Sequence, residues 1–172
     1  MMLIREAASE DHAEIHAVVA AAFDRTPEGH QGEADLVDAL RADGDALVEL
    51  VAEEDGFIVG HLLFSRLETR QGATDTGARF AALAPLSVLP ARQRDGIGLA
   101  LMQVGHELCR KAGVEAVIVL GHPDYYPRAG YSAAAATTVT APFSGPSFMA
   151  LALTPGALDA PTTIAYAPAF GL

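Results

Sequence analysis

The chain has 172 residues, of which 51% are hydrophobic and 19% charged, which predicts one ordered core and leaves too little chain for two domains. A formal net charge of −11 argues against a nucleic-acid-binding surface and weakly favours cationic small molecules or basic peptide ends. The single cysteine, Cys109, excludes an internal disulfide and a cysteine-based metal cluster. No apolar run is long enough to span a membrane, and the N-terminus lacks a signal pattern. We therefore expect a cytoplasmic protein that binds neither nucleic acid nor membrane.

The first half of the chain alternates strand-like and helix-like segments, which differ in the spacing of their apolar residues. In chain order we expect a strand at 3–7, a helix through 23, a polar loop at 25–32, a helix at 33–41, and strands at 47–52 and 57–67. Glu53 to Gly56 reads as a hairpin turn between the last two. Gly60 and His61 interrupt the second strand and predict a bulge or a close ligand approach.

The second half begins with a connector at 71–78 and an antiparallel strand at 80–89. Pro85 cannot donate to a ladder, so we expect an irregularity near it. Next come a helix from Ile97 to a glycine cap at Gly113, a buried strand at 114–120, a short helix, and a strand pair at 133–140 and 148–153. We predict one domain over 1–153, with a tail over 154–172 packed on it. The order predicts an α/β fold, a mixed sheet with helices on both faces.

The turn Gln93-Arg94-Asp95-Gly96-Ile97-Gly98 opens a helix directly after a strand. Backbone N–H groups at such a helix start have no intrahelical partner and point toward the positive end of the helix dipole. Gly96 and Gly98 let a ligand approach the backbone, while Arg92 and Arg94 can add contacts to phosphate. The turn is therefore a candidate cradle for a phosphate or pyrophosphate.

Two nucleotide motifs are excluded at this turn. A P-loop requires Lys-Ser/Thr after its glycines, and a dinucleotide fingerprint requires a third glycine where this chain has Leu101. The turn instead resembles the [Q/R]-x-x-G-x-[G/A] signature of the GNAT superfamily of N-acetyltransferases, matched by Gln93, Gly96 and Gly98. A second stretch, Tyr125 to Tyr131, is similar to the superfamily's aromatic-Tyr-x-[R/K]-x-Gly-aromatic hallmark. Together they resemble a branch of small bacterial predicted acetyltransferases across most of the chain.

This resemblance implies a mostly antiparallel mixed sheet that is splayed at an acetyl-CoA site, and acetyl transfer from acetyl-CoA to a primary amine. The Val88 N–H would face the thioester carbonyl as an oxyanion donor. Tyr126 would be the general acid, since a phenol is protonated at neutral pH. The residues implied in acetyl-CoA binding are Ser87, Val88, Leu89, Gln93, Arg94, Asp95, Gly96, Ile97, Gly98 and Leu99.

The base that deprotonates the amine stays open among Glu33, His61, His122 and a water chain. Glu33 shares the inward face of its helix, which makes it a catalytic candidate, although stabilisation by the helix dipole also explains a carboxylate there. For His61 we favour a half-buried, hydrogen-bonded strand histidine. His12 and His16 lack the order of a zinc-protease motif, so no metal is expected.

A second function from another class is an inactive acyl-CoA-binding sensor or interaction module. Retention of Tyr126 beside the cradle residues argues against it, because a pure binder has no use for the phenol. The sequence does not name the acceptor amine, which would lie in the crevice lined by its least diagnostic segments. A homodimer through edge strands or the tail would be compatible with it.

Overall fold

The structure, a computed structural model, describes residues 1–24 and 32–172. The polar loop expected at 25–32 thus lies, apart from Gly32, outside the described residues. Within them the helices are α1 (His12–Phe23), α2 (Gly32–Ala42) and α3 (Ile97–Lys111), and the strands are β1 (Met2–Glu6), β2 (Ala46–Glu54), β3 (Phe57–Gln71), β4 (Thr74–Asp75), β5 (Phe80–Val88), β6 (Ala116–Leu120), β7 (Val139–Thr140), β8 (Phe148–Ala152) and β9 (Thr162–Tyr166). No helix of the described part is long and apolar enough to cross a membrane.

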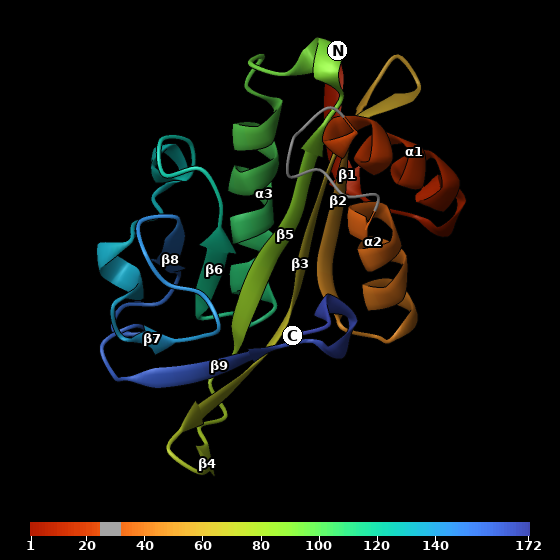
Figure 1. The fold of residues 1–172 in the computed structure, drawn as a ribbon. Coiled ribbons are helices and arrows are strands. Elements are labelled where there is room, and N and C mark those ends of the chain that lie inside the picture. Colours follow the sequence, from red (N-terminus) through yellow and green to blue (C-terminus); the bar gives the residue numbers. More distant parts are fainter. Residues whose placement is uncertain (25–31) are drawn as a thin grey trace.

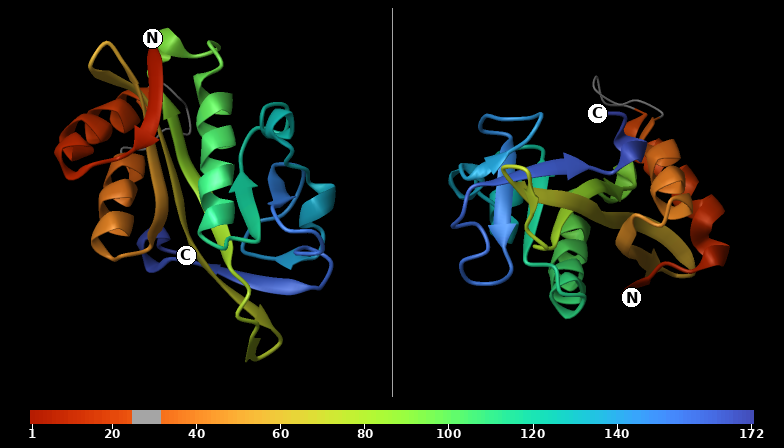
Figure 2. Two further views of the ribbon diagram at one scale, coloured as in Figure 1. Left: turned by 180° about the vertical axis from the view of Figure 1, so that it is seen from behind. Right: turned by 90° about the horizontal axis from the view of Figure 1, so that it is seen from below.

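The strands form one mixed sheet in the order β1-β2-β3-β5-β6-β8. Its pairs are antiparallel except β5 with β6 and β7 with β9, which are parallel. Figures 1 and 2 show α3 on one side of the strands and α1 with α2 on the other. The predicted fold class, an α/β sheet that is mostly antiparallel and has helices on both faces, is confirmed.

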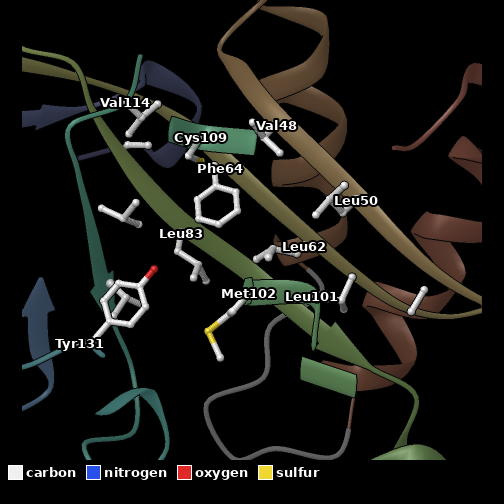
Figure 3. Packing of buried hydrophobic residues seen from close by; sticks show 14 of the residues in the cluster. Val48, Leu50, Leu62, Phe64, Leu83, Leu101, Met102, Cys109, Val114 and Tyr131 are labelled. Carbon is white, nitrogen blue, oxygen red and sulfur yellow. The ribbon is translucent and has the colours of Figure 1, made fainter. Parts of the chain in front are cut away.

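The alternation of side chains along β3 builds both sides of the sheet. Leu62 and Phe64 point into the cluster under α3, which also holds Leu101 and Met102 (Figure 3). Leu63 lies between them in sequence and joins the cluster under α1 and α2. This is the period of two expected of a strand that is buried on both faces.

The β2–β3 hairpin turns where the sequence predicts. Asp55 and Gly56 both have positive φ, 53° and 83°, as a type I′ turn requires. The ladder then shifts register, because Ala52 pairs with Gly60 but Glu53 pairs with Ile58. The extra residue is Val59, so the bulge lies just before the predicted position at Gly60 and His61.

Gly60 allows a close approach, but by a helix of this chain. A Cβ atom on Gly60 would lie 3.0 Å from Ile97 Cγ2 and 3.1 Å from Leu101 Cδ1. The small residue lets α3 pack against the strand on this face of the sheet, whereas the side chain of the neighbouring His61 lies on the other face.

The strand predicted at 148–153 is present as β8, but the strand predicted at 133–140 and the pairing of the two segments are wrong. Residues 134–136 form a 3₁₀ turn, β7 is only two residues long and pairs with β9, and β8 pairs with β6. The run of alanines lacks β-branched side chains, and Ser132 Oγ accepts the Ala135 N–H at 3.1 Å, which favours a turn.

The last 19 residues contribute to the sheet. β9 pairs antiparallel with β3 and parallel with β7, and its Ile164 is buried. The expected tail at 154–172 therefore holds a strand besides surface contacts. Its separation from a domain at 1–153 stays a prediction.

The closeness of α3 to β3 gives a stability prediction. A Cβ atom on Gly105 would lie 2.5 Å from Cε2 of Phe64, which is fully buried. We expect Gly105→Ala to lower the free energy of unfolding by about 1–2 kcal/mol, because overpacking exceeds the gain in helix propensity. Thermal unfolding should show a Tm several degrees lower, with the exposed Gln103→Ala as the control. A Tm at or above that of the wild type would contradict this packing.

Candidate functional site

The sheet opens between β5 and β6. These parallel strands pair only from Phe80 with Ala116 to Ala82 with Ile118, although β5 continues to Val88 and β6 to Leu120. Figure 1 shows them separating upward from their shared end. Ligands of α/β sheets commonly bind where neighbouring strands part at their carboxyl ends.

The backbone of Val88 faces this opening. The Leu89 N–H donates to the Val59 carbonyl at 2.9 Å, and Val88 pairs with Gly60. Since bonded and non-bonded pairs alternate in an antiparallel ladder, the Val88 N–H and C=O point away from β3. The carbonyl accepts a hydrogen bond from Gln93 Nε2 at 3.2 Å. The N–H is directed to the side on which β6 has moved away.

The N-terminus of α3 lies at the end of the same strand. Arg94 and Gly96 have φ values of 69° and 83°, so the turn winds tightly before the helix begins at Ile97. The first helical bond runs from the Ala100 N–H to the Gly96 carbonyl at 3.1 Å. The preceding N–H groups, those of residues 97–99, therefore have no helical acceptor. The turn therefore has the unpaired N–H groups on which the prediction of an anion cradle depends.

The two arginines of the turn differ in their contacts. Arg92 binds both carboxylate oxygens of Glu54 on β2, with Nη2 to Oε2 at 3.1 Å, and donates from Nε to Asp95 at 3.0 Å. The Glu54 contact lowers the pKa of that carboxyl and raises the pKa of Arg92. Arg92 is thus engaged by two carboxylates of the chain, and its contact with phosphate stays a prediction. Arg94 is exposed and makes no side-chain hydrogen bond within the described part of the chain.

Gly98 touches an aromatic side chain that the sequence did not associate with it. A Cβ atom there would lie 2.0 Å from the Tyr125 hydroxyl oxygen. The phenol of Tyr125 thus lies over the first turn of α3, in the region of the unpaired N–H groups. Burial raises the pKa of Tyr125, so its hydroxyl stays protonated at neutral pH.

The side chain of Tyr126 is packed more tightly than that of Tyr125. Its ring lies against Gly121, where a Cβ atom would come within 2.3 Å of Cε2. It packs edge-on against Tyr125 and Tyr131, with ring centroids 5.2 and 6.0 Å apart. Burial raises the pKa of Tyr126 well above its usual value. The side chain is therefore a rigid, protonated phenol at the end of β6.

Behind Tyr126 lies a buried hydrogen bond that the sequence did not reveal. His106 Nε2 on α3 and the Tyr131 hydroxyl are 2.7 Å apart. Burial, with the charge of Arg110, lowers the pKa of His106 to about 4, so its imidazole is neutral near pH 7. The contact fixes Tyr131, whose ring supports Tyr126 (Figure 3 shows Tyr131 in the core).

The opposite face of the sheet carries a second polar group of residues, under α2. Glu49 of β2 accepts from His61 Nε2 at 2.8 Å and from Arg41 Nη2 and Nε at 2.7 and 3.1 Å. His61 is fully buried, rather than half-buried as expected, and is hydrogen-bonded as expected. Its cross-strand partner on β5 is Ser87, also buried.

Two other candidates for the base differ in exposure. Glu33 lies in the first turn of α2, with its Oε2 buried and without a hydrogen-bond partner among the described residues. The Glu33 side chain therefore leans inward, as its helix position predicts. His122 follows β6 and is exposed.

One group of side chains has the spacing of metal ligands. His16, Asp35 and Asp38 offer ligand atoms that all lie within 4.8 Å of one another. The histidine Nδ1 is 2.9 Å from Asp38, which also accepts from Arg41 at 3.2 Å. Asp38 therefore already bonds to two side chains of the chain, and the cluster lies apart from the β5–β6 opening, on α1 and α2.

The arrangement as a whole combines a helix start with unpaired N–H groups, an unpaired backbone donor and a protonated phenol around one opening. The chain matches, over residues 3–134, the family model described as acetyltransferase (GNAT) domain. The chain belongs to the GNAT acetyltransferase family. Its expected membership and its nature as an N-acetyltransferase-family enzyme are thereby confirmed.

Two curated relatives of this GNAT acetyltransferase come from Escherichia coli K12. The uncharacterized N-acetyltransferase YjhQ is 41% identical over 123 residues, which are 70% of this chain and 64% of the relative's length. The uncharacterized N-acetyltransferase YhbS is 33% identical over 135 residues, which are 78% of this chain and 75% of the relative.

Two solved structures resemble this GNAT fold over nearly the whole chain. A GNAT family acetyltransferase from Brucella melitensis in complex with acetyl-CoA has a TM-score of 0.82 and 37% sequence identity. The match covers 99% of this chain and 98% of the Brucella chain. YhbS from Escherichia coli in complex with CoA has a TM-score of 0.86 and 28% identity, with coverage of 99% and 92%.

The lowered pKa of His106 predicts a pH-dependent stability. Between about pH 6.5 and 4 the unfolded chain binds a proton at this histidine that the folded chain excludes, so the free energy of unfolding falls as the pH falls through this window. The loss should amount to roughly 2–3 kcal/mol. Tm measured against pH should flatten in this window for His106→Gln, whereas the exposed His122→Gln should retain the slope. An unchanged slope in His106→Gln would refute the assignment.

Proposed function

We propose that this chain transfers an acetyl group from acetyl-CoA to a primary amine of a small molecule or a peptide. The observation that carries the proposal is the divergence of β5 from β6, which leaves the Val88 N–H unpaired beside the start of α3. The complexes of the two structural relatives with acetyl-CoA and CoA support this reading of the opening.

The donor would bind along β5 and over the start of α3. Its pyrophosphate would take the N–H groups of 94–99, where the helix dipole favours negative charge, with Gln93 bracing the turn through Val88. Arg94 would add a charge-assisted contact. The pantetheine arm would run beside Ser87, Val88 and Leu89. Because the Leu89 N–H is bonded to Val59, the Val88 carbonyl would accept the strand-like hydrogen bond from the arm with its second lone pair, which leaves the Val88 N–H for the thioester.

The reaction needs a donor for the carbonyl oxygen and an acid for the leaving sulfur. As the amine nitrogen forms a bond to the thioester carbon, negative charge grows on the carbonyl oxygen, and the Val88 N–H would stabilise it. The C–S bond then breaks, and Tyr126 would donate its phenolic proton to the thiolate. The raised pKa of Tyr126 keeps that proton available throughout the neutral range.

The acceptor would enter on the face covered by α1 and α2, opposite α3. Glu33 stays in the proposal as a catalytic carboxylate of this side, since its inward-leaning negative charge favours a cationic amine near the thioester. The net charge of −11 also attracts a cationic acceptor to the protein. A polyamine, an aminoglycoside, an amino-acid amide or a peptide N-terminus carries the required amine.

Donor binding is the first test. We expect calorimetric titration to give micromolar affinity for acetyl-CoA, and no binding of ATP, because ATP lacks the arm that Val88 would hold. Desulfo-CoA serves as a thiol-free control, and Arg94→Ala should bind about tenfold more weakly through loss of one charged contact. If no CoA species binds, the enzyme assignment falls, and the turn is only a helix start.

Replacing one tyrosine at a time by phenylalanine tests which residue is the general acid. Tyr126→Phe should lower kcat by about 10²–10⁴-fold with the Kd for acetyl-CoA unchanged, measured by free-thiol release with an amine found by screening the four classes above. Tyr166→Phe, far along the chain on β9, is the matched control.

Tyr125→Phe separates the two neighbouring phenols. If this variant loses kcat and Tyr126→Phe does not, the acid is Tyr125 and the assignment of Tyr126 is overturned. Binding of acetyl-CoA without transfer to any amine would instead favour the acyl-CoA sensor.

A further inference from the structure

His61 has a defined tautomer. Glu49 Oε2 lies 2.8 Å from His61 Nε2 and also accepts from Arg41. A carboxylate can only accept, and these contacts lower the pKa of Glu49 to about 2, so Nε2 carries the proton that is donated to it. In neutral His61 the lone pair therefore belongs to Nδ1.

That lone pair has no partner where the sheet opens. His61 Nδ1 is buried, and no described residue donates to it. Ser87 pairs directly with His61 across the ladder, and its Oγ is likewise buried and without a partner among the described residues. Side chains of directly opposed residues share a face of the sheet. Two unsatisfied polar atoms thus lie on one face, next in sequence to Val88.

Burial of such atoms costs free energy that a simple structural histidine would not require. An unsatisfied buried acceptor typically destabilises a fold by about 1–3 kcal/mol. His61 already has a strong bond to Glu49, which orients the ring and leaves one nitrogen directed elsewhere. The same division, with one ring nitrogen fixed by a carboxylate and the other unpaired, is what a general base requires.

We propose that His61 is the general base of the acetyl transfer and that Glu49 is its positioning residue. The inference rests on the proposed function. As the amine nitrogen bonds to the thioester carbon, its proton passes to His61 Nδ1, directly or through one water beside Ser87 Oγ. The electron pair of the breaking C–S bond leaves with sulfur, which takes the proton of Tyr126. Solvent then returns a proton to the phenolate and removes one from the imidazolium.

The charged groups near His61 are compatible with both the neutral and the protonated imidazole. Glu49 on β2 stabilises the imidazolium, and Arg41 on α2 offsets part of that carboxylate's charge. From α1, Glu14 accepts the Ile58 N–H of the same strand at 2.7 Å, while Glu33 lies at the other end of α2 from Arg41. β5 contributes the uncharged Ser87. The base is thereby distinguished from Glu33, which acts through its charge.

Two substitutions at His61 separate its two nitrogens. His61→Gln retains an N–H donor near the Nε2 position for Glu49 and has nothing at Nδ1. We expect it to fold and to bind acetyl-CoA as the wild type does, while kcat falls by about 10²–10⁴-fold. The acid limb of the kcat–pH profile, measured with a screened amine at saturation, should disappear. His61→Asn removes the Glu49 contact and should lose both Tm and kcat.

The control is His12→Gln, on the first turn of α1, which should keep the activity and the acid limb of the wild type. A His61→Gln variant that retains kcat and the acid limb overturns the inference. If His61→Gln fails to fold, nitrogen NMR of the ¹⁵N-histidine-labelled wild type decides. A chemical shift of His61 Nδ1 typical of an unprotonated ring nitrogen supports the assignment of His61 as the base. A shift that shows a proton on Nδ1 overturns it.

The two proposals fail in different ways. A wild-type protein that binds acetyl-CoA and acetylates no amine overturns the proposed function, and the inference about His61 with it. A wild type that acetylates an amine while His61→Gln does so at the same rate overturns the inference alone.

Discussion

The early end of the β5–β6 ladder is the constraint from which the site follows. Opposite Leu63, β5 carries Ala84 and Pro85, since Leu62 pairs with Leu86 and Phe64 with Leu83. Pro85 has no N–H for a ladder, and a bulge bends its strand and increases the local twist. The strand stays paired with β3 beyond the bulge but not with β6. Backbone groups that a regular sheet would use are thereby left for a ligand.

Close packing brings the helix start to this opening. Gly60 lets Ile97, the first residue of α3, lie against β3, and Gly105 admits the Phe64 ring two turns later. Larger residues at these points would lift α3 from the sheet. The distance between the unpaired N–H groups of α3 and the Val88 N–H is therefore set by core packing, which explains why the proposed ligand-binding turn is followed by so apolar a helix face.

The local parts of the site could be predicted from the sequence, and the non-local parts could not. The cradle and the tyrosine stretch are short motifs whose geometry depends on neighbouring residues, such as the positive φ of Gly96. The environment of His61 depends on register. Counting back from the hairpin turn would pair His61 with Leu50 and direct it toward α3. The bulge at Val59 shifts it opposite Val51 and onto the face of Glu49.

The positions of the buried polar atoms without hydrogen-bond partners connect the fold with the proposed chemistry. Ser65 Oγ is also buried without a partner among the described residues, but it lies beside the continuous part of the sheet, since Ser65 pairs with Ala82 and Ala82 with Ile118 of β6. The atoms of His61 and Ser87 differ because these two residues pair across the ladder next to Val88, where the ladder with β6 has ended. In the proposed reaction, an amine or a water bound there would satisfy both atoms. The free energy that their burial costs the fold would then be recovered as binding free energy of the amine or the water.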